Sequence, residues 1–318
     1  MVCFLRLSSA ANYNIMQFGA KGDGVTDDTK VFERAWQELC NDVEPSSRLT
    51  IPMPNTFLVG PITFQGPCKS PLIHIQILGT IMAPQNPSSW NGCETGAWLL
   101  FYKVNGLFID GGGTINGRGE AWWTKSSTYV HSIALHFESC NGLRLTKIKH
   151  RNSPRNHIGL NRCSYSTLSY LDIVAPANSP NTDGIDISLS TQVRVHHSII
   201  RTEVIFIGSL GMNGQYNTVE GVKVRKCQFS GTTNGARIKT WQSSAVKVSD
   251  ISYKIFVGTS LSRTAINFDC SNNVACTGIL LDQINITSTV KGEYPTVYCN
   301  NAYGTSSFSS PTASCLLN

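Results

Sequence analysis

The chain has 318 residues and a formal net charge of +6, and charged residues make up only 14% of it, against roughly 25% in an average soluble domain. So little charge argues against a disordered chain and against a helical bundle, and no apolar run is long enough for a membrane-spanning helix. Hydrophobic residues at 41%, with 27 glycines and 13 prolines, indicate an all-β protein of short strands and many turns. The diffuse positive charge suits an acidic polymer. Nucleic acid is not favoured, because the sequence has no zinc-finger spacing, RNA-binding aromatic motif or basic helix.

The N-terminal residues do not resemble a signal peptide, because Arg6 interrupts an apolar stretch that is already short. We expect residues 1–12 to be the remnant of a leader or a wrongly defined N-terminus. A single domain is expected over residues 13–318.

Residues 26–40 form the one clear amphipathic pattern and predict a helix. Its apolar face consists of Val31, Phe32, Ala35, Trp36 and Leu39. Thr26, Asp27 and Asp28 are expected to cap its N-terminus, where negative charge is favourable, and not to form a catalytic pair.

A repeated strand pattern, apolar-x-apolar-x-x-apolar, follows residue 140 with some irregular members. It occurs at Leu143–Ile148, Ser166–Leu171, Val193–Ser198, Val222–Cys227, Val246–Ile251 and Ile279–Ile284, and the last positions are 23, 27, 29, 24 and 33 residues apart. Repeats of this length with no helix between the strands predict the coils of a parallel β-helix, with a β-sandwich as the alternative. We expect Val195, Val224 and Val248 to point inward in stacked coils, and the helix over residues 26–40 to cover the open end.

Eleven cysteines are too many for a cytosolic enzyme of this size, and none forms a CxxC pair that would suggest zinc. Two pairs that bracket short polar loops are expected to form disulfides, Cys270 with Cys276 and Cys299 with Cys315. The sequence therefore predicts a secreted protein with no metal and no cofactor.

Two motifs could carry chemistry. Asn181, Thr182 and Asp183 followed by glycine form a turn signal when taken alone. Arg237 and Lys239 are two residues apart on a predicted strand, so both should project from the same outer face. Two neighbouring cations repel each other unless an anion lies between them, so a carboxylate ligand is predicted, with solvated surface charge as the alternative.

Together with other segments, these motifs resemble glycoside hydrolase family 28, the family of plant polygalacturonases. The matching segments are residues 13–24, 109–117, 122–123, 152–154, 179–184, 207–211 and 237–239. The resemblance implies a right-handed parallel β-helix that cleaves α-1,4-linked galacturonan by inverting hydrolysis. It implies Asp183 as a catalytic residue and Asn181, Arg237 and Lys239 as substrate-binding residues. It also implies a secreted, cell-wall enzyme; we expect a monomer.

The sequence departs from the family at two places. The family carries a Gly-Asp-Asp-Cys segment and then a Gly-His-Gly segment before the stretch that matches Ile207–Gly211, whereas here Thr202 leads through Glu203 directly into it. Roughly one coil, with the general acid, is therefore expected to be missing, and a second gap is expected after Gln242. Glu203 is the candidate replacement acid, whereas Asp186 is expected to face solvent.

Three functions therefore remain open. The first is a polygalacturonase with little activity in this chain, and the second is an inactive pectin-binding or vestigial family member. The third is a pectate-lyase-like β-helix, which would need a calcium-binding carboxylate cluster and an arginine base. The sequence shows no such cluster.

Overall fold

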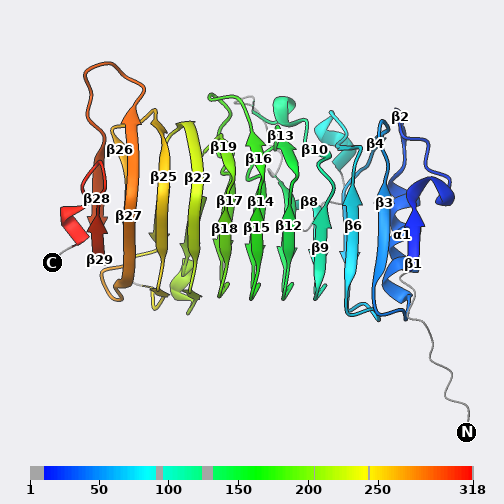
Figure 1. The fold of residues 1–318 in the computed structure, drawn as a ribbon, viewed down its shortest axis with the longest axis horizontal. Helices are drawn as coiled ribbons and strands as arrows, with labels where there is room; N and C mark the ends of the chain where they lie inside the picture. The colour runs from blue at the N-terminus through cyan, green and yellow to red at the C-terminus, as the bar shows by residue number, and fades with distance from the viewer. Residues whose placement is uncertain (1–10, 91–95, 124–131, 204, 243, 317–318) are drawn as a thin grey trace, which may run out of the picture.

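The computed structural model describes residues 11–90, 96–123, 132–203, 205–242 and 244–316. Strands stack along one long axis as a right-handed parallel β-helix (Figure 1). One sheet has nine strands in chain order: β5 (Ile62–Gln65), β8 (Ala97–Tyr102), β11 (Ile133–Glu138), β14 (Ile158–Asn161), β17 (Ile185–Ser188), β20 (Ile205–Leu210), β23 (Ala236–Thr240), β26 (Thr264–Asp269) and β28 (Thr296–Asn300).

The other strands belong to a 20-stranded sheet. Its N-terminal members are β1 (Ala11–Asn14), β2 (Asp23–Asp27), β3 (Ser47–Ile51), β4 (Thr56–Leu58), β6 (Ile73–Ile77), β7 (Thr80–Met82), β9 (Leu107–Asp110), β10 (Thr114–Asn116), β12 (Arg144–Thr146) and β13 (Lys149–Arg151). Its C-terminal members are β15 (Thr167–Ser169), β16 (Asp172–Val174), β18 (Arg194–His196), β19 (Ile199–Arg201), β21 (Thr218–Glu220), β22 (Lys223–Thr232), β24 (Lys247–Ser249), β25 (Ser252–Ser260), β27 (Cys276–Ser288) and β29 (Ala302–Ser307).

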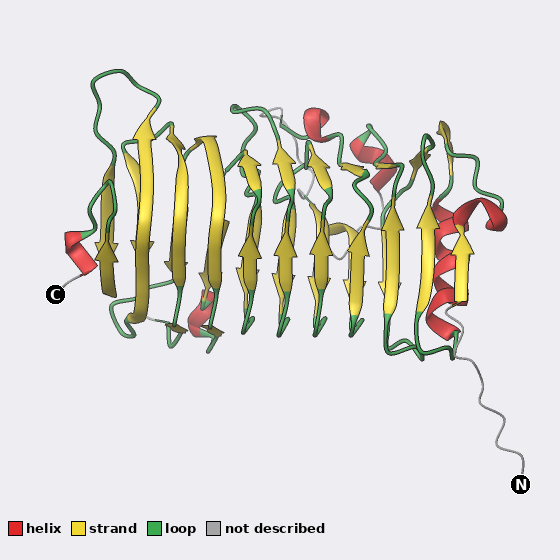
Figure 2. Cartoon of the chain, viewed as in Figure 1, coloured by secondary structure: helices red, strands yellow, loops and turns green. Residues whose placement is uncertain are grey.

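Helices are few and short (Figure 2). They are α1 (Thr29–Asn41) and the 3₁₀ turns η1 (Ile15–Phe18), η2 (Pro87–Trp90), η3 (Gly119–Ala121), η4 (Met212–Gly214) and η5 (Ser314–Leu316). Within the described ranges, no helix has the length and apolar composition needed to cross a membrane. Residues 1–10 of the expected leader lie outside the described residues, and Ala11 and Asn12 belong to β1, which pairs with β3.

The interior consists of apolar side chains stacked in register from coil to coil. Leu145 pairs with Leu168, Leu168 with Val195, and Val195 with Val224, and all are buried. Each residue therefore covers its counterpart in the next coil at the strand spacing of about 4.8 Å. All strand pairings among the described residues are parallel, so the β-helix is confirmed and the β-sandwich is excluded.

For one repeat, the sequence predicted the wrong register. Val248 is buried, as predicted, but it pairs with Val219, whereas Val224 pairs with Tyr253. The true counterpart of the Val222–Cys227 repeat is Ile251-x-Tyr253-x-x-Phe256. Strands β24 and β25 follow each other closely, so the patterns Val246–Ile251 and Ile251–Phe256 overlap in this segment. The coil uses the second pattern, in which Tyr253 and Phe256 take the apolar positions.

Helix α1 lies beside β1 and β3 at the N-terminal end of the β-helix, as expected (Figure 1). Its buried residues include Phe32, Ala35, Trp36 and Leu39. The helix begins three residues later than predicted, because Thr26 and Asp27 belong to β2. Asp27 still accepts a hydrogen bond from the Thr29 amide at 2.9 Å, whereas the buried Asp28 carboxylate accepts the Lys21 and Gly22 amides and fixes the preceding loop.

Among the described residues, three disulfides close the fold. Cys270–Cys276 and Cys299–Cys315 confirm the sequence prediction. The third, Cys40–Cys68, was not predicted; it joins the end of α1 to a turn 28 residues away. It therefore ties the covering helix to the first coils.

Removing the Cys40–Cys68 bridge should destabilise the protein more than removing the Cys270–Cys276 bridge. Loop-closure entropy grows with the number of bridged residues, 28 against 6, which corresponds to about 3.5 and about 2 kcal/mol. Denaturant unfolding of the two paired Cys→Ser variants measures the difference. The opposite order would show that the bridge on α1 does not constrain the unfolded chain.

Candidate active site

The outer face of the nine-stranded sheet presents one side chain from each coil in register. Asp186 of β17 pairs with Phe206 of β20, and Phe206 pairs with Arg237 of β23. Their neighbours along the strands, Ile185 and Ile238 among them, are buried in the interior. The period-two alternation of these strands therefore places Asp186, Phe206 and Arg237 side by side on the outside.

Asp183 and Glu203 meet at the start of this row. Ile185 pairs with Ile205, so the residues two positions earlier, Asp183 and Glu203, share a register position on adjacent coils. The Glu203 amide donates a hydrogen bond to the carbonyl of Thr182 at 3.3 Å. Burial, followed by the charge of Glu203, raises the pKa of Asp183 to about 7, against the opposing effect of Arg237 and Arg155.

Asp186 projects outward as expected, but the expectation that it faces solvent is wrong. Its Oδ2 accepts a hydrogen bond from Asn156 Nδ2 at 2.7 Å, and its Oδ1 is enclosed. Burial and then the charge of Asp183 raise the pKa of Asp186 well above its ordinary range. Alternation indicates the side of the sheet on which a residue lies, but not whether neighbouring loops cover it there.

Arg237 and Lys239 lie on the same outer face of β23, as predicted, with buried Ile238 between them. The Arg237 guanidinium lies 5.1 Å from the centre of the Phe206 ring, and the Lys239 ammonium lies 5.9 Å from that of Trp241. Both cations therefore rest on aromatic rings. Arg237 Nε is buried and has no hydrogen-bond partner among the described residues.

Asn181 is exposed, with a φ of 54°, in the turn before Asp183. The next residue fixes this turn, because the Thr182 hydroxyl shares a hydrogen bond with the Ser179 hydroxyl at 2.7 Å and accepts one from the Thr202 hydroxyl at 2.9 Å. The structure thus brings Asp183, Glu203 and Arg237 together, whereas Lys239 lies two residues further along its strand and Asn181 lies in an exposed turn.

Sequence reasoning missed Arg155, Asn156 and Phe206 in this site. Arg155 and Asn156 come from the loop before β14, and the charge of Arg155 acts on both Asp183 and Asp186. Their signal was present, because they directly follow Asn152-Ser153-Pro154, a segment that already resembled the family. Nothing in the sequence singled out Phe206, because an aromatic residue in a strand is as typical of the core as of a binding site.

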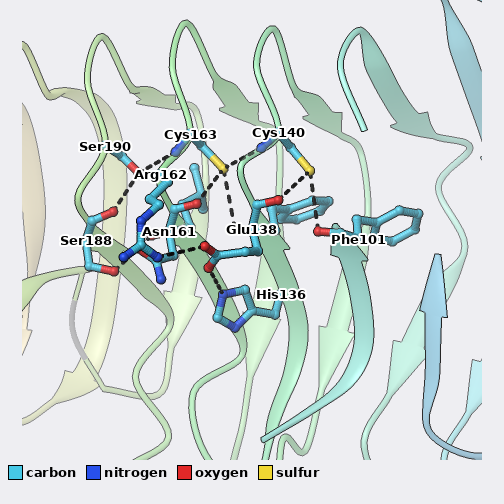
Figure 3. Close-up of polar contacts among 11 residues, drawn as sticks. Phe101, His136, Glu138, Cys140, Asn161, Arg162, Cys163, Ser188 and Ser190 are labelled. Carbon is cyan, nitrogen blue, oxygen red and sulfur yellow. Dashed lines mark hydrogen bonds and ion pairs between the residues drawn. The ribbon is translucent and has the colours of Figure 1, made fainter. Parts of the chain in front are cut away.

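The same face continues toward the N-terminus as an open groove of about 570 Å³ along β5, β8 and β11. Figure 3 shows His136 and Arg162 beside the Glu138 carboxylate, at 3.6 and 2.9 Å. Although burial opposes it, these two partners lower the pKa of Glu138. Behind them, stacked Cys140, Cys163 and Ser190 link three coils, because the Cys140 amide donates to Cys163 Sγ and the Cys163 amide to Ser190 Oγ. These hydrogen bonds tie the three coils together behind the groove.

The raised pKa of Asp183 predicts a pH-dependent stability. Between about pH 4, where this carboxyl ionises in the unfolded chain, and about pH 7, the folded state holds one more proton than the unfolded state. The free energy of unfolding should therefore fall as pH rises through this window, by up to about 1.4 kcal/mol per pH unit. Asp183→Asn should flatten the curve, measured by urea unfolding from pH 4 to 7.5. Parallel curves for the two proteins would contradict the placement of this carboxyl.

No group of three or more metal-binding side chains in the described part of the chain is arranged to hold an ion.

Comparisons with known proteins give one consistent result. The model of the family "Glycosyl hydrolases family 28" matches residues 40–203, 204–257 and 242–315. A probable polygalacturonase of Arabidopsis thaliana is 36% identical, over 98% of this chain and 82% of its own length. A polygalacturonase of Persea americana is 34% identical, over 92% of this chain and 78% of its own.

Solved structures agree on the fold. The endo-xylogalacturonan hydrolase of Aspergillus tubingensis superposes with a TM-score of 0.73 at 19% identity, over 95% of this chain and 92% of its own. The polygalacturonase of Erwinia carotovora gives 0.66 at 20% identity, over 95% and 94%. With the family model covering most of the chain and curated relatives above 30% identity, the chain belongs to glycosyl hydrolases family 28.

Proposed function

We propose that this chain binds α-1,4-galacturonan along the outer face of the nine-stranded sheet and hydrolyses it, with inversion, far more slowly than a complete family member. The observation that carries the proposal is the placement of two carboxyls, Asp183 and Glu203, on adjacent coils near the cation Arg237. Asn181 and Lys239 complete the proposed binding residues.

Binding is supported by polar atoms that are left without partners on this one face. They are Asn156 Oδ1, Asp183 Oδ1, Asp186 Oδ1, Arg237 Nε and Asn267 Oδ1, and Asn267 follows Arg237 in register on the next strand. Buried polar atoms without a hydrogen bond are costly, so a cluster of them needs a physical explanation, of which a functional site is one. A sugar acid offers both hydroxyl donors and a carboxylate acceptor.

The slow rate follows from the geometry of the carboxyl pair. Inverting hydrolysis needs an acid and a base about 6.5–9.5 Å apart, so that a water molecule fits between the base and the sugar. Asp183 and Glu203 instead come from adjacent coils, about one strand spacing or roughly 4.8 Å apart at the backbone. A protonated Asp183 can act as an acid, but Glu203 lies too close to direct a water molecule onto the opposite face of the sugar.

Two observations support the expectation that internal segments are missing. The Arabidopsis relative aligns over 381 residues, whereas this chain has 318. The stretches matched by the family model also meet at residues 203 and 204 and restart at residue 242, the two places where the family motifs break off. The lost coil would have carried the general acid.

The disulfides agree with an extracellular protein, and we propose that the chain acts in the cell wall as a monomer on pectin. Affinity electrophoresis in gels containing polygalacturonate, beside a reducing-end assay on the same preparation, tests the proposal. Retarded migration with little product is the expected result, and unretarded migration would contradict the binding.

A further inference from the structure

A second cationic area lies on the 20-stranded sheet, away from the carboxyl cluster. Arg194 of β18 pairs with Lys223 of β22, and His196 pairs with Arg225, so these side chains form two adjacent rows. Arg194, Lys223 and Arg225 are exposed, with buried Val195 and Val224 between them on the strands. Adjacent coils therefore place like charges about one strand spacing apart, roughly 4.8 Å.

A third row follows at the corner of the coil. Tyr170, His197 and Lys226 each have a φ of 52°, and this left-handed conformation ends the strand segment. The Tyr170 ring is 52% exposed and stacks on the His197 ring at 5.0 Å. Arg194, Lys223, Arg225, Lys226 and Tyr170 are called the basic surface below.

The cations of the basic surface are not neutralised. Among the described residues, no carboxylate lies within ion-pair distance of Arg194, Lys223, Arg225 or Lys226. The carboxylates at its edges include Glu220 and Asp282, which pair with Lys247 and Lys254, and Asp250. Burial and then the charges of His197 and Arg194 lower the pKa of His196, as expected in positive surroundings.

The surface is also hollowed on both sides of the corner. One open hollow, of about 630 Å³, is lined by the cations Lys223, Arg225 and Lys254 together with the carboxylates Asp250 and Asp282. A second, of about 590 Å³, is lined by residues that include Tyr170, His197 and Lys226. Ile255 lines both hollows, so they adjoin at this residue across β22 and β25. An extended ligand can therefore contact the cations and the tyrosine ring together.

We propose that the basic surface is a second binding site for an acidic polysaccharide, separate from the groove on the nine-stranded sheet. Closely spaced free cations favour a ligand whose carboxylates repeat along a chain. The exposed Tyr170 ring offers a flat apolar face on which the C–H face of a sugar ring can pack. This combination favours a polyuronate over an acidic protein. The site would hold the protein on the polymer whether or not the groove is occupied.

The test uses the full chain with its groove disabled by Arg237→Ala and Lys239→Ala, so that failure of the proposed groove does not affect the result. In this parent, Arg194→Gln, Lys223→Gln and Arg225→Gln remove the charge of the basic surface. The matched control is Lys21→Gln, Lys69→Gln and Lys291→Gln, which removes the same charge from exposed positions elsewhere. A third variant is Tyr170→Ala. Affinity is measured for polygalacturonate, polyglutamate and fully methyl-esterified pectin.

We expect the basic-surface triple variant to bind polygalacturonate about tenfold more weakly than the control triple variant. This factor corresponds to the summed free energies of three exposed ion pairs between the protein and the polymer. Tyr170→Ala should weaken polygalacturonate binding while polyglutamate binding is unchanged, and esterified pectin should bind weakly to every variant. Equal affinity of the two triple variants would overturn the site. Polyglutamate binding as tight as that of polygalacturonate, with no effect of Tyr170→Ala, would overturn its assignment to a polysaccharide.

Discussion

Purified chain should release reducing ends from polygalacturonate about 10²–10⁴-fold more slowly than a complete plant polygalacturonase, the usual effect of losing a positioned general acid. The physical reason is that the carboxyls of Asp183 and Glu203 come from adjacent coils about one strand spacing apart, roughly 4.8 Å, and are not separated across a glycosidic bond. A reducing-end assay over long incubation measures the difference.

The control variants are Asp183→Asn and Glu203→Gln, which keep the size of each side chain. If the chain hydrolyses its substrate rapidly and Asp183→Asn abolishes that activity, the proposal of low activity is wrong. Loss of the same activity in Glu203→Gln would then identify Glu203 as the second catalytic carboxyl. A residual rate that neither substitution changes would indicate a contaminating enzyme, so both variants need the same purification.

Loss of Arg237 and Lys239 together should weaken binding of a galacturonate oligomer by about 10²-fold. Each cation can make one charge-assisted hydrogen bond to a sugar carboxylate, worth about 1.5–3 kcal/mol when fully formed and less at partly exposed positions. The effect should shrink with added salt, because charges at partial exposure are screened over about 8 Å at physiological ionic strength.

Titration calorimetry on the variant that lacks the basic surface isolates the groove. Arg237→Lys is the informative comparison, because it keeps the charge but loses the planar guanidinium that stacks on Phe206. Affinity unchanged in Arg237→Ala with Lys239→Ala would contradict the groove as the galacturonan site. A matched pair, Lys21→Ala with Lys69→Ala, should leave the affinity unchanged.

The sequence predicted the coils well because the alternation of apolar and polar residues within each strand indicates which side chains are buried. Leu145, Leu168, Val195 and Val224 alternate with polar residues, and this local pattern determines which side faces the interior. The register of Val248 was wrong for a physical reason, since two overlapping apolar patterns in one segment satisfy the same alternation. The uneven spacing of that repeat, 24 and then 33 residues, was the visible sign.

The site was predicted only in part. The comparison with the family motifs identified Glu203 as a candidate beside Asp183, and the structure places the two on adjacent coils. Enclosure of Asp186 by Asn156 could not be predicted, because it depends on how a loop of the preceding coil folds over the sheet. The Cys40–Cys68 bridge could not be predicted for the same reason, since its two residues meet only when α1 covers the first coils.

The unbroken ladder from Ile185 to Ile205 has a consequence for the cell that makes this protein. Chaperones and proteases recognise exposed apolar surface and open strand edges, and a solenoid that closes directly across a missing unit presents neither at that point. A family member that lacked one whole coil would then pass folding quality control as readily as a complete one. If this chain has the low activity proposed above, its amount in a tissue would be a poor measure of pectin turnover there, and it would compete with active family members for the same polymer.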